Sequence, residues 1–201
     1  DQNLMDIRLV STFGFDDEEI SEIKKYDTDI NGIKGGYSAD MLILTNDGTS
    51  EITRVYSADT EALDENSPDY ISRFTLLEGR FPQNPNECLI EANTPGEYGI
   101  GDTITLCSGD SETDTADILK NDTFTVTGKI SWVKYVDFER GTTTIGNGSI
   151  GSYLVVPDEA FAYEYYTDVY ITYKNTMDMD SFEKEYQNFI DNKSDKLEKL
   201  Y

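Results

Sequence analysis

The run Asp27-Thr-Asp-Ile-Asn-Gly32 has the residue types and spacing with which a helix–loop–helix calcium site begins. Such a loop binds Ca²⁺ through carboxylate and carbonyl oxygens, and it needs a bidentate Glu at its twelfth position and a second helix after it. Counted from Asp27, the twelfth residue is Ser38, and the apolar run 39–44 that follows is typical of a strand. We therefore assign no metal ligand, and calcium binding near Asp27 stays an open alternative.

The favoured interpretation of the same run is an acidic turn between a helix and a strand. Asn31-Gly32 and Gly35-Gly36 are residue types that adopt positive φ, and we expect them to do so where the chain reverses. Asp27 and Asp29 are expected to face water.

A second run, Gly146-Asn-Gly-Ser-Ile-Gly151, matches the G-x-G-x-x-G pattern of dinucleotide sites. That pattern binds pyrophosphate only where a strand precedes it and a helix follows, so that the helix N-terminus holds the anion. Here the apolar run 153–156 follows and predicts a strand. We expect a glycine-rich loop or hairpin, and no cofactor.

Pairs of carboxylates are the residues that hydrolyse glycosides, so each close pair is a candidate. The candidates are Asp16/Asp17, Glu18/Glu19 and Asp178/Asp180. Because the chain has 40 acidic residues, adjacency carries little information, and helix starts and caps explain these pairs. We expect no enzyme and no catalytic residue, with a two-carboxylate hydrolase as the weakest alternative.

Aromatic residues offer a further binding chemistry, because they form platforms for sugars or peptides. Trp132 with Tyr135 and Phe138, and the run Tyr163-Glu-Tyr-Tyr166, are the candidates. Aromatic residues in a β-rich region more often pack in the core, and we favour that interpretation.

The chain lacks His, which removes the most common general base and transition-metal ligand. Cys88 and Cys107 lack C-x-x-C spacing, and two cysteines cannot build a zinc site alone. Two buried thiols are the favoured interpretation. A disulfide between them stays open, and it would require an oxidising compartment.

The formal charge is −24, from 40 acidic and 16 basic residues among 201. This charge repels phosphate backbones, so we expect no nucleic-acid partner. A hydrophobic share of 37% is enough for one core or two small ones. No apolar run reaches the ~18 residues of a membrane span. Because the chain starts at Asp1 and ends inside an expected helix, we expect it to be a segment of a longer protein.

Both ends of the chain predict mixed structure. Alternation over residues 5–9 predicts a strand, and Asp16 with Glu19 forms a capping-box pattern for a helix that ends near Tyr26. Near the C-terminus, residues 169–173 predict a strand. Asp180, with Glu183 three residues later, predicts the cap of a last helix. The apolar stripe of that helix is Phe182, Tyr186, Phe189, Ile190, Leu197 and Leu200.

The middle of the chain predicts short strands separated by turns. They cover residues 52–56, 74–77, 88–90, 103–106, 124–127, 130–133 and 153–156. The predicted fold class is therefore α+β: a mixed α/β lobe from both chain ends (1–75 and 157–201) with an inserted, small, barrel-like β-rich lobe (76–156). A hinge, if present, would lie near residues 75 and 157.

Several segments, taken in order, resemble the region after the first membrane helix of ABC-transporter permeases of the MacB/FtsX type. They are Met5-Asp-Ile-Arg-Leu-Val-Ser11, Gly14-Phe-Asp-Asp-Glu-Glu-Ile20, Gly32-Ile-Lys-Gly-Gly-Tyr-Ser-Ala-Asp40, Leu77-Glu-Gly-Arg-Phe-Pro82, Glu87-Cys-Leu-Ile-Glu91, Ile100-Gly-Asp-Thr-Ile104, Phe124-Thr-Val-Thr-Gly128 and Tyr153-Leu-Val-Val-Pro157. The resemblance covers nearly the whole chain.

The resemblance implies an extracytoplasmic domain at the cell membrane, with an α/β lobe and an inserted β-rich lobe. Its implied partners are a cytoplasmic ATP-binding subunit, a second permease subunit and an unidentified lipoprotein, peptide or antibiotic. The domain would handle a substrate or transmit a signal, coupled to ATP hydrolysis. The alternative is a secreted or surface-anchored module that binds a cationic peptide or glycan.

The family motifs imply structural roles for Gly79, Arg80, Gly101, Asp102 and Gly128. Gly79 and Gly101 would lie in turns that need a permissive backbone, and Gly128 would end a strand. Arg80 would pair with a carboxylate across a lobe boundary. The substrate, the direction of transport, the ATPase partner and the oligomeric state are not determined by the sequence.

Overall fold

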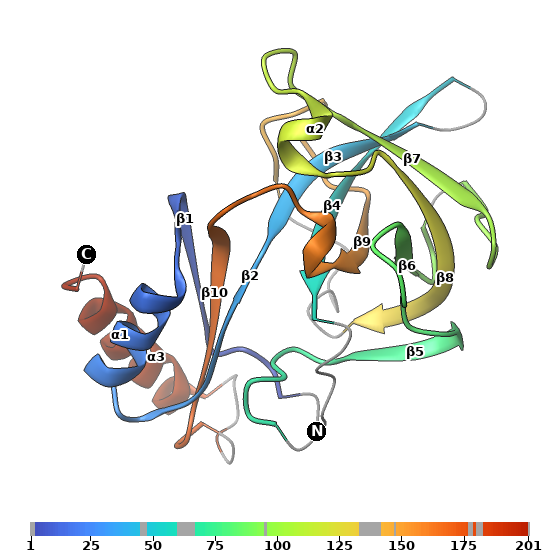
Figure 1. The fold of residues 1–201 in the computed structure, drawn as a ribbon. Coiled ribbons are helices and arrows are strands. Elements are labelled where there is room, and N and C mark those ends of the chain that lie inside the picture. The colour runs from blue at the N-terminus through green and yellow to red at the C-terminus, as the bar shows by residue number, and fades with distance from the viewer. Residues whose placement is uncertain are drawn as a thin grey trace. The chain divides into compact units, whose positions relative to one another are not determined.

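The computed structural model describes residues 3–44, 48–59, 67–94, 96–132, 142–146, 148–176, 179 and 183–200. The fold is α+β, as predicted, and the chain divides into two compact units (Figure 1). Unit 1 comprises Asp1–Gly35, Asp64–Arg73 and Tyr165–Tyr201, and unit 2 comprises Gly36–Leu63 and Phe74–Glu164. Each unit has its own hydrophobic core.

Unit 1 is a three-stranded sheet with two helices on one side of it (Figure 1). Its strand order is β1-β10-β2, and β1 and β10 are antiparallel. Apolar residues from all five elements form one buried cluster between helices and sheet, as expected for a two-layer unit. The elements are β1 (Ile7–Phe15), α1 (Asp17–Tyr26), β2 (Ile30–Gly36), β10 (Tyr166–Tyr173) and α3 (Lys184–Leu197).

The capping prediction for α1 is confirmed. The Asp16 side chain accepts a hydrogen bond from the Glu19 backbone N–H at 2.8 Å, and the Glu19 side chain accepts one from the Asp16 N–H at 3.0 Å. The prediction for α3 differs from the structure, because this helix begins at Lys184 with Glu183 as its N-cap. Asp180, the predicted cap, lies outside the described residues.

The predicted reversal at residues 31–36 is wrong, because these residues form strand β2 and none of its glycines has positive φ. The glycines instead permit close packing. A Cβ on Gly32 would lie 2.0 Å from the Pro68 carbonyl oxygen, and one on Gly35 would lie 2.5 Å from the Tyr166 ring. Glycine in a strand interior often marks such a close approach.

Unit 2 is a closed barrel of six strands in the order β8-β6-β9-β4-β3-β7, where β7 also pairs with β8. Closure leaves no strand edge unpaired within the ring, and β5 adds to β8 from outside it. The strands are β3 (Ser38–Leu44), β4 (Ser50–Ala58), β5 (Phe74–Gly79), β6 (Glu87–Glu91), β7 (Thr103–Ser108), β8 (Thr123–Trp132) and β9 (Ser152–Pro157). A short helix, α2 (Thr115–Ile118), and a 3₁₀ turn, η2 (Asp158–Ala160), complete the unit.

Strand β8 has three partners and is the strand through which the barrel closes. One edge pairs with β6 over residues 125–130. The other edge pairs with β7 over residues 123–125 and with β5 over residues 128–132. The sequence predicted two strands here, 124–127 and 130–133, with Gly128 at the end of the first. This prediction is wrong, because pairing on both edges keeps the backbone extended through Gly128.

The barrel interior is filled by apolar side chains, so Phe124, Ile104 and Leu106 are at most 1% exposed. A second cluster surrounds Trp132, whose ring packs edge-on against Tyr56 and Tyr153. Trp132 therefore belongs to the core. Its two proposed platform partners, Tyr135 and Phe138, lie outside the described residues.

The division into units differs from the expected one for residues 36–63, 74–75 and 157–164, which belong to unit 2. The reason is strand pairing: β3 pairs with β7, and β4 pairs in parallel with β9. The chain therefore passes between units near residues 35, 63, 73 and 164 rather than near 75 and 157.

Candidate functional site

The five family-motif positions lie together around residues 126–128 of β8. Gly79 pairs with Gly128 across the β5–β8 ladder, and the Arg80 N–H donates to the Thr127 carbonyl at 2.9 Å. The Gly101 N–H donates to the Val126 carbonyl at 2.8 Å. Three segments that are far apart in the sequence thus meet at one point of the barrel wall, which we call the motif corner.

Two glycines permit this contact. Gly79 has φ of +81°, and a Cβ there would lie 2.2 Å from the Thr127 carbonyl oxygen. A Cβ on Gly128 would lie 2.7 Å from the Arg80 carbonyl oxygen. Gly101 has φ of +94° but open space around it, so only its backbone conformation favours glycine.

Asp102 fixes the turn that leads into β7. Its carboxylate accepts a hydrogen bond from the Gly99 N–H at 2.8 Å, and its own N–H donates to the Gly99 carbonyl at 3.2 Å. Its carbonyl accepts from the Val126 N–H at 2.8 Å. The short side chain thus stabilises a local turn, a common use of Asp, while the backbone joins the turn to β8.

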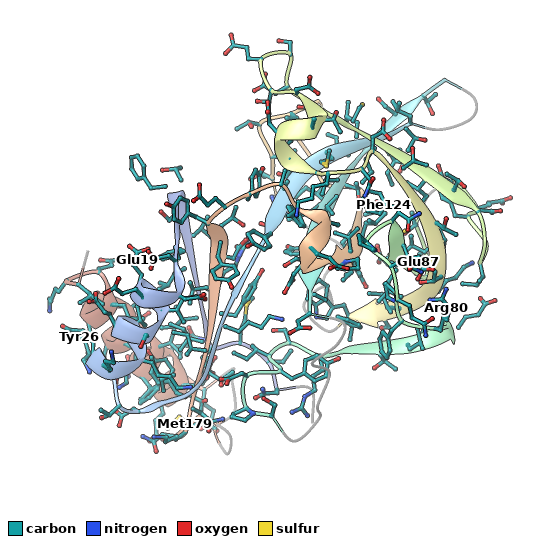
Figure 2. All side chains as sticks on the ribbon, viewed as in Figure 1. Glu19, Tyr26, Arg80, Glu87, Phe124 and Met179 are labelled. Carbon is teal, nitrogen blue, oxygen red and sulfur yellow. The ribbon has the colours of Figure 1, made fainter. Side chains whose placement is uncertain are left out.

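Arg80 and Glu87 form a two-pronged ion pair at the motif corner (Figure 2). Nη1 and Nη2 of Arg80 donate to Oε2 and Oε1 of Glu87 at 2.7 and 2.8 Å. Glu87 also accepts from the Gln83 N–H at 2.7 Å and from Asn84 Nδ2 at 3.0 Å. The expectation of a pair across a lobe boundary is wrong, since both residues belong to unit 2.

The Glu87 carboxylate is strongly stabilised in its charged form. Its side chain is 11% exposed, whereas that of Arg80 is 47% exposed. The hydrogen bonds from Arg80 lower the pKa of Glu87 to about 2, and those from Gln83 and Asn84 add to this effect, whereas burial opposes it. Glu87 therefore holds the 80–87 loop in place through these hydrogen bonds. In the sequence, the only sign of this role is that an acidic residue lies seven positions after Arg80.

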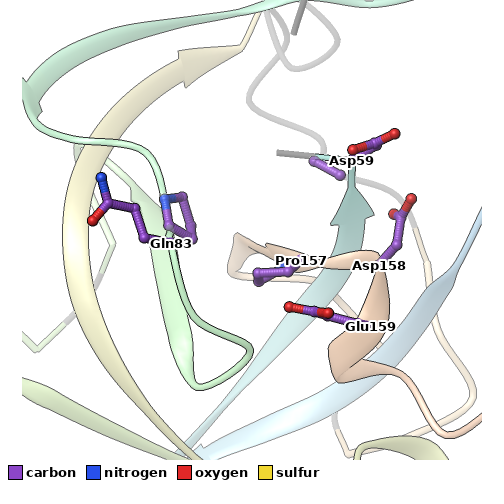
Figure 3. Close-up of a pocket in the computed structure, with 7 residues that line it drawn as sticks. Asp59, Gln83, Pro157, Asp158 and Glu159 are labelled. Atoms are coloured by element: carbon purple, nitrogen blue, oxygen red, sulfur yellow. The ribbon is translucent and has the colours of Figure 1, made fainter. Parts of the chain in front are cut away.

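A cavity of about 460 Å³ lies next to this loop (Figure 3). Seven residues line it: Ala58, Asp59, Pro82, Gln83, Pro157, Asp158 and Glu159. They come from the end of β4, the loop that Glu87 holds, and the junction of β9 with η2. Three of the side chains are carboxylic acids and none is basic, so the lining favours a positively charged group. We call this cavity the acidic pocket.

The acidic run at Asp27 is not arranged for calcium. Asp27 is 1% exposed rather than facing water, and its Oδ1 and Oδ2 both lie 3.0 Å from Lys193 Nζ. Asp29 Oδ2 lies 2.7 Å from the same ammonium. The Lys193 ammonium thus lies where a calcium ion bound by these carboxylates would have to lie. Among the described residues, no group of three or more acidic or cysteine side chains has an arrangement that could hold a metal ion.

The remaining sequence candidates are the glycine run, the two cysteines and the aromatic run 163–166. Strand β9 follows the glycine run that ends at Gly151, so no helix N-terminus is present there to hold a phosphate. Cys88 lies in β6 and Cys107 in β7, and both thiols are free. Tyr163 is partly buried and packs against Phe161 with ring centroids 5.7 Å apart, whereas Tyr165 of the same run is exposed.

No family model and no curated protein matches this chain. Among solved structures it is similar to the extracellular domain of the noncanonic ABC-type transporter YknZ from Gram-positive bacteria, with a TM-score of 0.46 and 11% identity over 92% of this chain and 87% of that chain. It is also similar to the periplasmic region of MacB from Actinobacillus actinomycetemcomitans, with a TM-score of 0.44 and 11% identity over 96% of this chain and 75% of that chain.

The helices in the described part of the chain are short and polar. None of them has both the length and the apolar composition to cross a bilayer.

Proposed function

We propose that this chain is the extracytoplasmic domain of an ABC-transporter permease subunit. In this role the domain is not an enzyme. It handles a substrate or transmits a signal outside the membrane, coupled to ATP hydrolysis by a cytoplasmic partner. A second permease subunit and a lipoprotein, peptide or antibiotic substrate complete the proposed assembly.

The observation that carries this proposal is the motif corner. The segments around Gly79, Gly101 and Gly128 were singled out by their resemblance to the permease family, and they are far apart in the sequence. In the folded chain they contact one another through backbone hydrogen bonds and glycine packing. A chance match of short motifs gives no reason for its parts to meet in space.

The test uses the native full-length protein in its own cells. Membranes are washed with carbonate, intact cells are treated with protease, and an antibody to this segment detects the products. We expect the protein to stay in the washed membrane and the segment to be cleaved from outside. Release into the wash or the medium would contradict the proposal.

A second candidate is a binding module for a cationic peptide, and the acidic pocket favours it. Its lining contains three carboxylic acids, and the chain as a whole carries a formal charge of −24. Calorimetric titration with tri-arginine would give saturable heat that Glu159→Gln weakens. The matched control is Glu112→Gln, an exposed acid of the same unit that is not part of the lining. Equal binding by both variants, or none by the parent chain, would exclude this candidate.

A further inference from the structure

The inward face of α3 carries a charged residue at its centre. The side chains that recur along this face are Tyr186, Phe189, Ile190, Lys193 and Leu197, and Leu200 follows just after the helix end. Helical spacing would place an apolar residue at position 193, yet Lys193 is there and is only 9% exposed. Lysine is almost never buried to this extent unless it is paired.

The three donors of the Lys193 ammonium face three carboxylate oxygens. Nζ lies 3.0 Å from each carboxylate oxygen of Asp27 and 2.7 Å from Oδ2 of Asp29. Lys196 Nζ lies 3.1 Å from Asp27 Oδ1. The Lys193 ammonium also lies 4.9 Å from the centroid of the Tyr173 ring, at a cation–π distance. We call Asp27, Asp29, Lys193 and Lys196 the Lys193 cluster.

This cluster determines where α3 lies on the sheet of unit 1, but it adds little to the net stability of that contact. Desolvation of buried charges offsets most of their attraction, so a buried ion pair contributes little net stability. Both lysines are on α3, however, so a displacement of this helix would leave the buried Asp27 carboxylate without either ammonium, which is costly. A rotation of α3, or a shift by one turn, would move Lys193 away from Asp27, and those positions are therefore disfavoured.

The apolar part of the contact is mostly only half-buried. Of the residues of α3, only Lys193 and Leu197 are buried, and its other apolar residues are half-buried. Near the start of the helix, the Tyr186 hydroxyl lies 3.0 Å from Asp6 Oδ1. Elements with little fully buried apolar surface open first when proteins unfold locally.

We propose that α3 is a detachable helix, which leaves the sheet of unit 1 as one piece while β1 and β10 stay folded. The Lys193 cluster sets the position to which it returns. In the docked state Lys193 pairs with Asp27 and Asp29, and the Tyr186 hydroxyl contacts Asp6. This inference concerns unit 1 and does not depend on the proposed function.

Native-state hydrogen exchange on the 201-residue chain tests the proposal, because amide exchange rates report how readily each helix or strand opens. We expect the amides of residues 184–197 to exchange at least tenfold faster than those of residues 166–173. We expect Asp27→Asn to accelerate exchange in α3 tenfold or more and to leave β10 unchanged. Equal protection of α3 and β10 in the parent chain would overturn the proposal. Equal acceleration of exchange in α3 and β10 by Asp27→Asn would also overturn it.

Matched variants keep the result interpretable. Asp191→Asn removes an exposed acid from the same helix and is expected to change nothing. Asp29→Asn removes one contact from a half-exposed acid, and it replaces Asp27→Asn if that variant does not fold. Lys193→Met combined with Asp27→Asn is expected to accelerate α3 exchange less than the two single effects together. Simple additivity would overturn the role of the cluster.

Discussion

At the scale of single residues, Glu87 is a carboxylate whose pKa is clearly shifted. Its pKa lies near 2 in the folded chain, against an ordinary value of 4.5. A depressed folded-state pKa contributes stability that is complete above the unfolded value and is lost as the pH falls through the folded value. The window for this loss is therefore about pH 4.5 down to about pH 2.

We expect Glu87→Gln to lower stability at pH 7 and to make the curve of stability against pH less steep in that window. Urea denaturation midpoints, measured at pH steps from 7 to 2 for both chains, check this. Only the difference between the two chains is informative, because many other acids titrate in both. Parallel curves would contradict the assignment.

Gly79 and Gly101 form a matched pair for separating backbone strain from crowding. Both have positive φ, but only at Gly79 would an added Cβ have an atom within 3 Å of it. We expect Gly101→Ala to lower the free energy of unfolding by about 1–2 kcal/mol, from the left-handed backbone alone. Gly79→Ala should cost more, because the Thr127 carbonyl must also move. Equal urea midpoints for Gly79→Ala and Gly101→Ala would show that the packing of Gly79 against the Thr127 carbonyl is loose.

At the scale of elements, β8 organises the barrel, since it pairs with β5, β6 and β7. Phe124 lies near its start, is fully buried and belongs to the barrel core (Figure 2). Truncating a buried Phe removes its transfer free energy and leaves a cavity.

We therefore expect Phe124→Ala to lower the free energy of unfolding by about 3–5 kcal/mol. The control is Leu77→Ala in β5, where the side chain is 57% exposed, and we expect a change within about 0.5 kcal/mol. Chemical denaturation of both variants gives the comparison. A loss at Phe124 no larger than that at Leu77 would contradict the described core.

Elements also show where sequence patterns succeed. The capping pair Asp16 and Glu19 is local, so the start of α1 was predictable from four residues. The continuity of β8 through Gly128 was not, because a glycine between two apolar runs is an ordinary break signal. Only its pairing with β6 on one edge and β5 on the other keeps this position in the strand.

At the scale of the whole molecule, the charge of −24 opposes the compact state through repulsion among acidic groups. Salt screens this repulsion between exposed charges. We expect the melting temperature at pH 7 to rise as sodium chloride increases from about 10 mM to about 300 mM, which spans Debye lengths of ~30 Å to below 10 Å. Calorimetry at each salt concentration measures the rise.

The control for this prediction is the same series near pH 4.1, the isoelectric point from the sequence. The net charge is close to zero there, so the rise should disappear. A rise of the same size at both pH values would point to salt effects other than charge screening.

The sequence by itself determined the α+β class, the start and end of α1, and most barrel strands. Those features depend on neighbouring residues or on composition. Tertiary structure alone decided that β3 and β4 belong to the barrel, that Glu87 is the partner of Arg80, and that Asp27 meets Lys193, 166 residues away. The reason is physical: such contacts depend on which strand edges and helix faces meet, and local propensity carries no information about that choice.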